Sequence, residues 1–205
     1  MEKEQYLNDL KDIKEMMSRS SRFISLSGGS GISVGLIALA GAWAAWQSVY
    51  QNLELTAYGK TLMSDGNLTR LLGIAAATLL LSLAFGIYFT TRETKKRNQK
   101  IWDHQTRRLL VNLAIPLLAG GILCLLLLFD GLVGLMPGLT LIFYGLALVN
   151  ASKYTLTELR SLGVLEIALG LAAIHFVSVG LLFWAIGFGA LQIVYGIVVP
   201  LKYKP

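Results

Sequence analysis

The stretch from Arg92 to Phe129 decides the fold. Residues 92–108, RETKKRNQKIWDHQTRR, carry seven basic side chains against Glu93 and Asp103, and residues 109–129, LLVNLAIPLLAGGILCLLLLF, carry no charge. A bilayer core about 30 Å thick is crossed by roughly 20 helical residues, so residues 109–129 predict a membrane-spanning helix beside a basic loop. Five more apolar stretches predict further spans, at residues 32–50, 71–91, 132–150, 162–179 and 180–200. We therefore predict an all-α, polytopic bundle of six transmembrane helices arranged as hairpins.

Composition agrees with a membrane protein. Of the 205 residues, 55% are apolar and only 15% are charged, which is too little charge for the surface of a soluble domain of this size. We predict two parts, a polar head at residues 1–22 and a transmembrane domain at residues 23–205. The net charge of +6 lies in loops beside the spans, as membrane insertion requires, so we expect membrane lipids and no nucleic acid as partners.

The distribution of basic residues predicts the orientation of the chain. If the N-terminus is cytoplasmic, the head holds five Lys or Arg residues, the loop after the second span seven, the loop after the fourth span two and the tail two. Only Lys60 and Arg70 then lie outside. Cytoplasmic loops are enriched in Lys and Arg, so we predict a multi-pass protein of the bacterial inner membrane with both termini in the cytoplasm.

The head predicts a short amphipathic cytoplasmic helix. Tyr6, Leu10, Ile13 and Met17 follow one another at spacings of four, three and four, which places them on one helix face. The remaining faces are slightly acidic up to Arg19, unlike helices that lie on anionic lipid. This stripe therefore predicts contact with the protein's own loops, with a second copy in a homo-oligomer, or with a cytoplasmic protein partner.

Two segments of the chain repeat each other. Tyr144-Gly145 precedes Lys153-Tyr154, and Tyr195-Gly196 precedes Lys202-Tyr203. Each segment closes a hairpin with a very short exterior turn, which predicts repeated hairpins in one orientation, three in total. The glycines in the spans predict close helix packing.

The second half of the chain resembles a known group. Residues 117–203 combine apolar hairpins, glycines within helices, the turn Leu135-Met136-Pro137-Gly138 and a Tyr-Gly near each hairpin end. In these features they look like the small six-span bacterial membrane proteins linked to acid resistance, the HdeD-like proteins. The resemblance implies the architecture only, because that group offers no catalytic residues to carry over.

Glu166 is the sharpest candidate for a functional side chain. It lies about one turn inside the predicted fifth span, and an ionisable group within the membrane is a functional candidate by default. Several polar side chains are expected at comparable depth. The candidate intramembrane site therefore comprises Glu166, Asn112, Asn150, Tyr144, Gln192 and Tyr195. The alternative is a structural carboxyl group hydrogen-bonded to neighbouring helices.

Two other kinds of candidate stand apart from this site. His175 is nine residues after Glu166, which at about 100° per residue puts it on the opposite helix face, so we treat it as an isolated titratable group. The basic loop predicts contact with anionic lipid head groups, through Arg92, Lys95, Lys96, Arg97, Lys100, Arg107 and Arg108. With one cysteine, Cys124, and two histidines, the sequence predicts no metal site and no cofactor.

Three functions compete for this architecture. The first is a non-enzymatic membrane module that self-assembles or binds a partner through its head. The second is a small ion or solute channel or transporter with Glu166 in its pathway. The third is an intramembrane enzyme, which needs convergent acid, base and nucleophile groups that the sequence does not provide. We favour the first.

Overall fold

The computed structural model describes residues 28–52, 65–96, 104–155 and 157–202. Within these ranges the chain is helical and contains no strand, which confirms the predicted all-α class. The long helices are α2 (Gly28–Ser48), α3 (Asp65–Lys96), α4 (His104–Phe129), α5 (Met136–Ala151) and α6 (Thr157–His175). A last helix runs through α7 (Gly180–Trp184), the π-helical segment η5 (Ala185–Leu191) and α8 (Gln192–Lys202). Short 3-10 turns lie at Tyr50–Asn52, Val133–Leu135, Ser152–Tyr154 and Val177–Val179.

Five of these helical stretches are long and apolar enough to cross a membrane, and together they support a helical membrane bundle. The exception is α6, whose 19 residues include Glu158, Arg160 and Glu166. The count of six spans therefore stays a prediction. The predicted helix of the head, with Tyr6, Leu10, Ile13 and Met17, lies outside the described residues.

The surface of the bundle suits hydrocarbon better than water. Large apolar side chains along α3 and α4 are exposed, among them Leu80 and Leu118, each with 66% of its surface accessible. No part of the apolar stretch of α3 is buried within the bundle. Such a continuous apolar exterior marks a surface in contact with lipid or with another protein.

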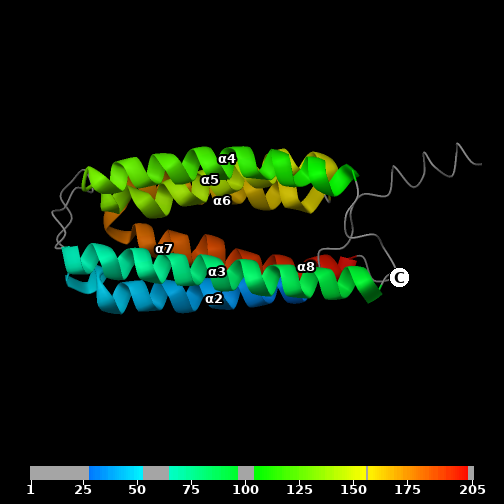
Figure 1. Ribbon diagram of the computed structural model, residues 1–205, viewed down its shortest axis with the longest axis horizontal. Coiled ribbons are helices and arrows are strands. Elements are labelled where there is room, and N and C mark those ends of the chain that lie inside the picture. Colours follow the sequence, from blue (N-terminus) through cyan, green and yellow to red (C-terminus); the bar gives the residue numbers. More distant parts are fainter. Residues whose placement is uncertain (1–27, 53–64, 97–103, 156, 203–205) are drawn as a thin grey trace, which may run out of the picture.

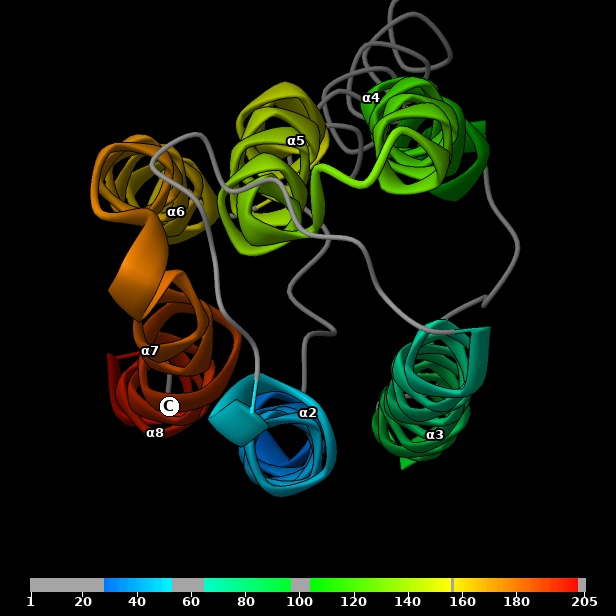
Figure 2. The ribbon, with the colours of Figure 1, turned by 90° about the vertical axis from the view of Figure 1, so that its left-hand side faces the viewer.

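The helices form a ring in chain order (Figures 1 and 2). Each hairpin packs on itself, with α2 against α3, α4 against α5, and α6 against α7. Neighbouring hairpins then join through α5 against α6 and through α8 against α2. The remaining neighbours, α3 and α4, stand apart in the end-on view. The ring therefore has five packed junctions and one open one.

The α5–α6 junction depends on two pairs of glycines. A Cβ added to Gly138 would lie 2.8 Å from the carbonyl oxygen of Gly170, and one added to Gly170 would lie 2.7 Å from that of Gly138. Gly145 and Gly163 face each other in the same way, at 2.5 and 2.7 Å. On both helices the glycines are seven residues apart, so they lie on one face and let the backbones meet.

The α2–α8 side of the ring repeats this arrangement. A Cβ on Gly35 would lie 2.7 Å from the carbonyl oxygen of Gly189, and one on Gly196 would lie 2.7 Å from that of Gly28. These glycines are again seven residues apart on each helix. The Tyr-Gly echo in the sequence thus marks equivalent places, because Gly145 packs on Gly163, the first glycine of α6, and Gly196 packs on Gly28, the first glycine of α2.

The open junction lacks the residues for a third interface of this kind. The only glycines of α4 are the adjacent Gly120 and Gly121, and a Cβ on Gly120 would collide with Phe143 of α5. On α3, added Cβ atoms at Gly66 and Gly73 would meet nothing within 4 Å. The α3–α4 junction therefore has no glycine interface of this kind, although glycine pairs are not required for packing, since α2–α3 and α4–α5 pack without them.

Two features shape the connection between α4 and α5. Asp130-Gly131 is a tight turn in which Gly131 has a φ of 79°, a conformation that favours glycine. Pro137 lies in the first turn of α5, which begins at Met136, after the predicted start of this span at residue 132. Both features fix the connection between α4 and α5 at one end of the bundle.

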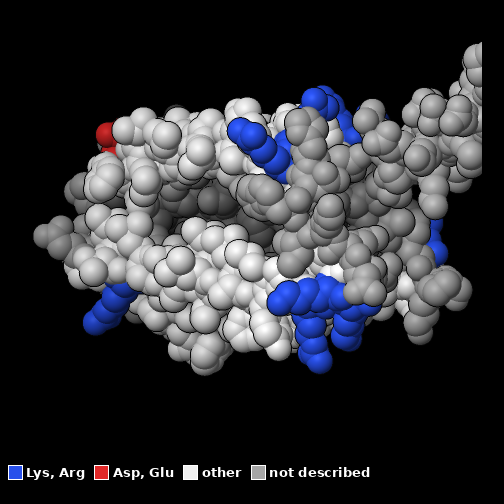
Figure 3. All heavy atoms as spheres, turned by 45° about the vertical axis from the view of Figure 1, so that its right-hand side comes forward, with Lys and Arg blue, Asp and Glu red and all other residues white. Residues whose placement is uncertain are grey.

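Charged side chains divide the two ends of the bundle. Arg70 near the start of α3 and Asp130 just after the end of α4 lie toward one end of the bundle, and most described Lys and Arg residues gather toward the other (Figure 3). We call the second end the basic end. Its described basic residues are Arg92, Lys95, Lys96, Arg107, Arg108, Lys153, Arg160 and Lys202. This division follows the bias from which we predict that the basic end faces the cytoplasm.

Candidate functional site: an apolar cavity at the open junction

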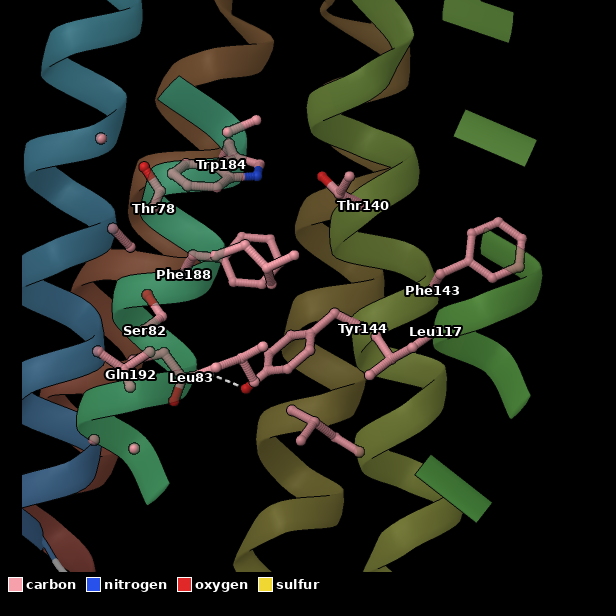
Figure 4. Close-up of a pocket in the computed structure, with 18 of the residues that line it drawn as sticks. Thr78, Ser82, Leu83, Leu117, Thr140, Phe143, Tyr144, Trp184, Phe188 and Gln192 are labelled. Carbon is pink, nitrogen blue, oxygen red and sulfur yellow. Dashed lines mark hydrogen bonds between the residues drawn. The ribbon is translucent and has the colours of Figure 1, made fainter. Parts of the chain in front are cut away.

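A cavity of about 870 Å³ lies inside the ring, beside the open junction. Its walls come from all the long helices, with Leu159 and Leu162 as the contribution of α6, and Figure 3 shows the hollow between the two rows of helices. Most of the lining is apolar. The polar side chains on the α3 and α5 walls include Thr78, Ser82 and Thr140, which Figure 4 shows around the space. Cys124 also lines it.

Three aromatic rings form one wall of the cavity. The ring centroids of Trp184 and Phe188 are 4.9 Å apart, and those of Phe188 and Tyr144 are 4.8 Å apart. Trp184, Phe188 and Gln192 succeed one another at spacings of four, which places them on one face of the last helix (Figure 4). The rings of each pair are tilted against each other, and together they give an apolar wall.

One polar pair interrupts this wall. The side-chain amide of Gln192, Nε2, donates a hydrogen bond of 2.6 Å to the hydroxyl of Tyr144 (Figure 4). Both residues line the cavity, and Gln192 is buried. The bond ties α5 to the last helix across the ring. A buried amide and hydroxyl that satisfy each other in this way avoid the cost of unpaired polar groups.

Glu166 lies outside the cavity. Its side chain is fully buried, and its carboxyl oxygens have no hydrogen-bond partner among the described residues. The carboxyl lies against Gly187, where an added Cβ would collide with Oε2 of Glu166 and Cδ2 of Leu141. Glu166 is therefore buried between α6 and the last helix and does not line the cavity.

The π-helical segment makes room for this carboxyl. Two glycines of η5 face different neighbours, Gly187 toward Glu166 and Gly189 toward Leu39 and the backbone at Gly35 of α2. A π-helical turn widens the helix and changes which residues share a face, and such turns recur at functional sites. Here the segment lets the last helix pack on α6 and α2 at once.

The six residues of the predicted polar site divide into groups. The amide of Asn150 donates to the Asn112 carbonyl oxygen at 2.9 Å and to its side-chain Oδ1 at 3.3 Å, which joins α5 to α4. Tyr144 pairs with Gln192, and Tyr195 lines the cavity beside the buried cluster around Leu148. Neither carboxyl oxygen of Glu166 is hydrogen-bonded to either pair. The structure thus gathers Tyr144, Gln192 and Tyr195 at the cavity and separates Asn112, Asn150 and Glu166 from its lining.

The other predicted candidates are also located. His175 ends α6, is exposed, and lies edge-on to Phe176 with centroids 4.6 Å apart. Arg92, Lys95, Lys96, Arg107 and Arg108 are exposed at the basic end, whereas Arg97 and Lys100 lie outside the described residues. Among the described residues, no group of His, Cys, Asp and Glu could hold a metal ion.

The cavity itself was missed by the sequence analysis. Its aromatic wall is encoded by the spacing of Trp184, Phe188 and Gln192, but the same spacing is typical of any packed helix face. The open junction has no local sequence signal either, since α2–α3 and α4–α5 pack without matched glycine pairs. Compared with protein-family models, curated proteins and solved structures, the chain shows no match.

Proposed function

We propose that this protein is a non-enzymatic, multi-pass membrane protein that binds the hydrocarbon chain of a membrane lipid in the cavity between α3 and α4. The observation that carries the proposal is the apolar cavity of about 870 Å³ at the one open junction of the ring. This volume lies within the range of small-molecule binding sites, roughly 300–1,000 Å³.

The surroundings of the cavity decide what enters it. Its lining offers few hydrogen-bond partners, and apolar cavities of this kind stay dry and take up apolar ligands. In a bilayer, the space between α3 and α4 faces lipid chains, which are present at high concentration. An acyl chain is therefore expected to occupy the cavity with a more favourable free energy than water or a polar solute.

Filling the cavity tests the proposal. Ser82 and Leu80 lie on the same helix, but only Ser82 lines the cavity, whereas Leu80 is 66% exposed. Native mass spectrometry of the purified chain should detect retained phospholipid in the wild type. Ser82→Trp should reduce retention at least fivefold, and the control Leu80→Trp should leave it unchanged. Equal retention by both variants would place the lipid elsewhere and refute the proposal.

A channel or transporter with Glu166 in its pathway is the second candidate. The observation in its favour is a fully buried carboxyl without a hydrogen-bond partner among the described residues, beside a π-helical segment. Glu166 does not line the cavity, which weighs against a continuous pathway through this residue. Glu166→Gln in reconstituted vesicles should abolish flux if Glu166 carries the transported ion, and unchanged flux across several ions and solutes would remove it from this role.

The role of the head is part of the proposal. We expect the stripe of Tyr6, Leu10, Ile13 and Met17 to bind a second copy or a cytoplasmic protein, and six spans to leave both termini in the cytoplasm of a bacterial cell. Deletion of residues 1–18 should remove that interaction and preserve lipid retention. If partner binding and self-association both survive the deletion, the head is not the binding segment.

A further inference from the structure

We infer that α4 is hinged at Pro116 and that the side chain of Asn150 holds this hinge in place, which controls how far the junction between α3 and α4 stands open. The control of lipid entry rests on the proposed function, whereas the hinge itself does not. The evidence is a hydrogen bond to the carbonyl group that the proline leaves without its helical partner.

Pro116 lies inside α4, which continues as one helix on both sides of it. In a regular α-helix the N–H of residue 116 would donate to the carbonyl oxygen of Asn112, four residues earlier. Proline has no N–H, and its ring also crowds that carbonyl group. The carbonyl oxygen of Asn112 therefore lacks its helical partner, and α4 lacks one of the bonds that keep a helix straight.

The side chain of Asn150 on α5 supplies the missing donor. Its amide nitrogen, Nδ2, lies 2.9 Å from the carbonyl oxygen of Asn112 and 3.3 Å from the side-chain Oδ1 of the same residue. Neighbouring helices can satisfy the backbone groups that a proline frees in a membrane-spanning helix. Here the donor comes from α5, so the bond ties α4 to the rest of the ring directly before the proline.

The segment of α4 before Pro116 forms a wall of the cavity. It packs on α5 and on the turn Ser152–Tyr154, whereas α3 and α4 stand apart (Figure 2). A tilt of this segment about Pro116 would therefore change the width of the open junction without disrupting a packed α3–α4 interface. The segment lines the cavity through Leu109, Leu110 and Leu113.

Apolar contacts alone do not fix the angle of this segment. Leu109 and Leu113 pack against a buried cluster that comprises Leu148, Ala151, Leu159 and Leu162, and hydrophobic contacts are non-directional. A hydrogen bond, in contrast, weakens steeply as its angle departs from linearity. The Asn150 bond therefore holds the segment at one inclination, and its loss lets α4 bend at the proline, where sharp helix kinks usually occur.

Spin-label distances across the junction test the hinge in the full chain. In a Cys124→Ala background, labels at Ile87→Cys and Leu110→Cys measure the distance from α3 to the part of α4 before the proline. Labels at Leu79→Cys and Gly121→Cys measure the distance to the part after it. All four labelled positions line the cavity and are exposed.

Asn150→Leu removes the donor and should release the hinge. A bend of about 20° at Pro116 moves residue 110, six residues away at about 1.5 Å each, by about 3 Å. We expect the Ile87–Leu110 distance to shift or broaden by this amount and the Leu79–Gly121 distance to stay unchanged. Equal changes in both distances would mean general loosening of the bundle and would overturn the hinge.

Two further variants make the test specific to this bond. Pro116→Ala restores the N–H that the Asn112 carbonyl oxygen lacks, so Pro116→Ala with Asn150→Leu should return the first distance to its wild-type value. Asn112→Ala keeps the main-chain carbonyl group and should leave both distances unchanged. A shift that Pro116→Ala does not reverse would overturn the role of Asn150. If Asn150→Leu does not assemble, Pro116→Ala alone should narrow the first distance distribution, and no narrowing would overturn the hinge.

Lipid retention separates this inference from the proposed function. By native mass spectrometry, Asn150→Leu should retain about threefold less phospholipid than the wild type, because a wider junction releases its ligand faster, and Pro116→Ala should restore retention. Unchanged distances with normal retention would overturn the hinge and leave the acyl-chain site in place. Shifted distances with unchanged retention would overturn the control of lipid entry. Shifted distances in a protein that retains no lipid in any form would overturn the proposed function and leave the hinge in place.

Discussion

The carboxyl group of Glu166 in α6 lies directly against Gly187 of the π-helical segment η5. The carboxyl group of Glu166 occupies the position in which a side chain at residue 187 would lie. The acid is fully buried and has no hydrogen-bond partner among the described residues. The absence of a side chain at Gly187 therefore allows the only buried acid of the described helices to fit between α6 and the last helix.

Gly187→Ala tests this fit. The new methyl group would collide with Oε2 of Glu166 and Cδ2 of Leu141, and overpacking a close-packed interior costs about 1–3 kcal/mol. We expect a lower midpoint of thermal unfolding in detergent. Glu166→Ala in the same chain should recover part of the loss, because it removes one of the two colliding groups.

Gly73→Ala is the matched control for that experiment. It lies within α3, and an added Cβ there would meet nothing within 4 Å. Alanine is favoured over glycine in a helix by about 0.5–1 kcal/mol, so its unfolding midpoint should stay unchanged or rise. A loss of stability equal to that of Gly187→Ala would show that crowding at Glu166 is not the cause.

The two glycine junctions should respond alike. A Cβ on Gly170 would lie 2.7 Å from the Gly138 carbonyl oxygen, and one on Gly35 would lie 2.7 Å from that of Gly189. Because the obstacle is backbone in both cases, the helices must separate. We expect Gly170→Ala and Gly35→Ala each to destabilise the bundle by about 1–3 kcal/mol, measured by thermal unfolding. If only one of them did so, the two junctions would not be equivalent.

The Tyr144–Gln192 bond makes a separate prediction. Tyr144→Phe removes the hydroxyl that accepts from Gln192 Nε2 at 2.6 Å and leaves a buried amide unpaired, which costs about 1–3 kcal/mol. Gln192→Leu in the Tyr144→Phe background should restore part of the stability, because no unpaired group remains. Additive losses in this double-mutant cycle would mean that the two side chains do not interact.

How far the sequence predicts this structure depends on the kind of signal. The helical class, five of the six apolar spans and the turn at Gly131 follow from local composition, so the sequence predicts them. The equivalence of Gly145 and Gly196 was visible as a short echo. The sequence did not predict that the polar candidates separate into groups. The positions of Asn150 and Glu166 along their helices indicate depth in the bundle but not which neighbouring side chain each one contacts. The cavity depends on which helices fail to pack, and no local pattern encodes that.

The predicted orientation has its own test. In a chain with Cys124→Ala, a single cysteine is placed at Lys60 or at Lys96. A thiol reagent that does not cross membranes should label Lys60→Cys in intact cells and should label Lys96→Cys only after the membrane is opened. Labelling of both positions from outside would contradict the orientation derived from the basic residues.

Quenching of Trp184 by lipid chains tests the central claim most directly. Trp184 lines the cavity, whereas Trp43 is 65% exposed on α2. Two variants that keep one tryptophan each, with the others changed to Phe, are reconstituted in bilayers whose acyl chains carry bromine, a contact quencher of indole fluorescence. If acyl chains enter the ring between α3 and α4, Trp184 is quenched to an extent comparable with Trp43. Strong quenching of Trp43 with none of Trp184 would mean that lipid does not occupy the cavity.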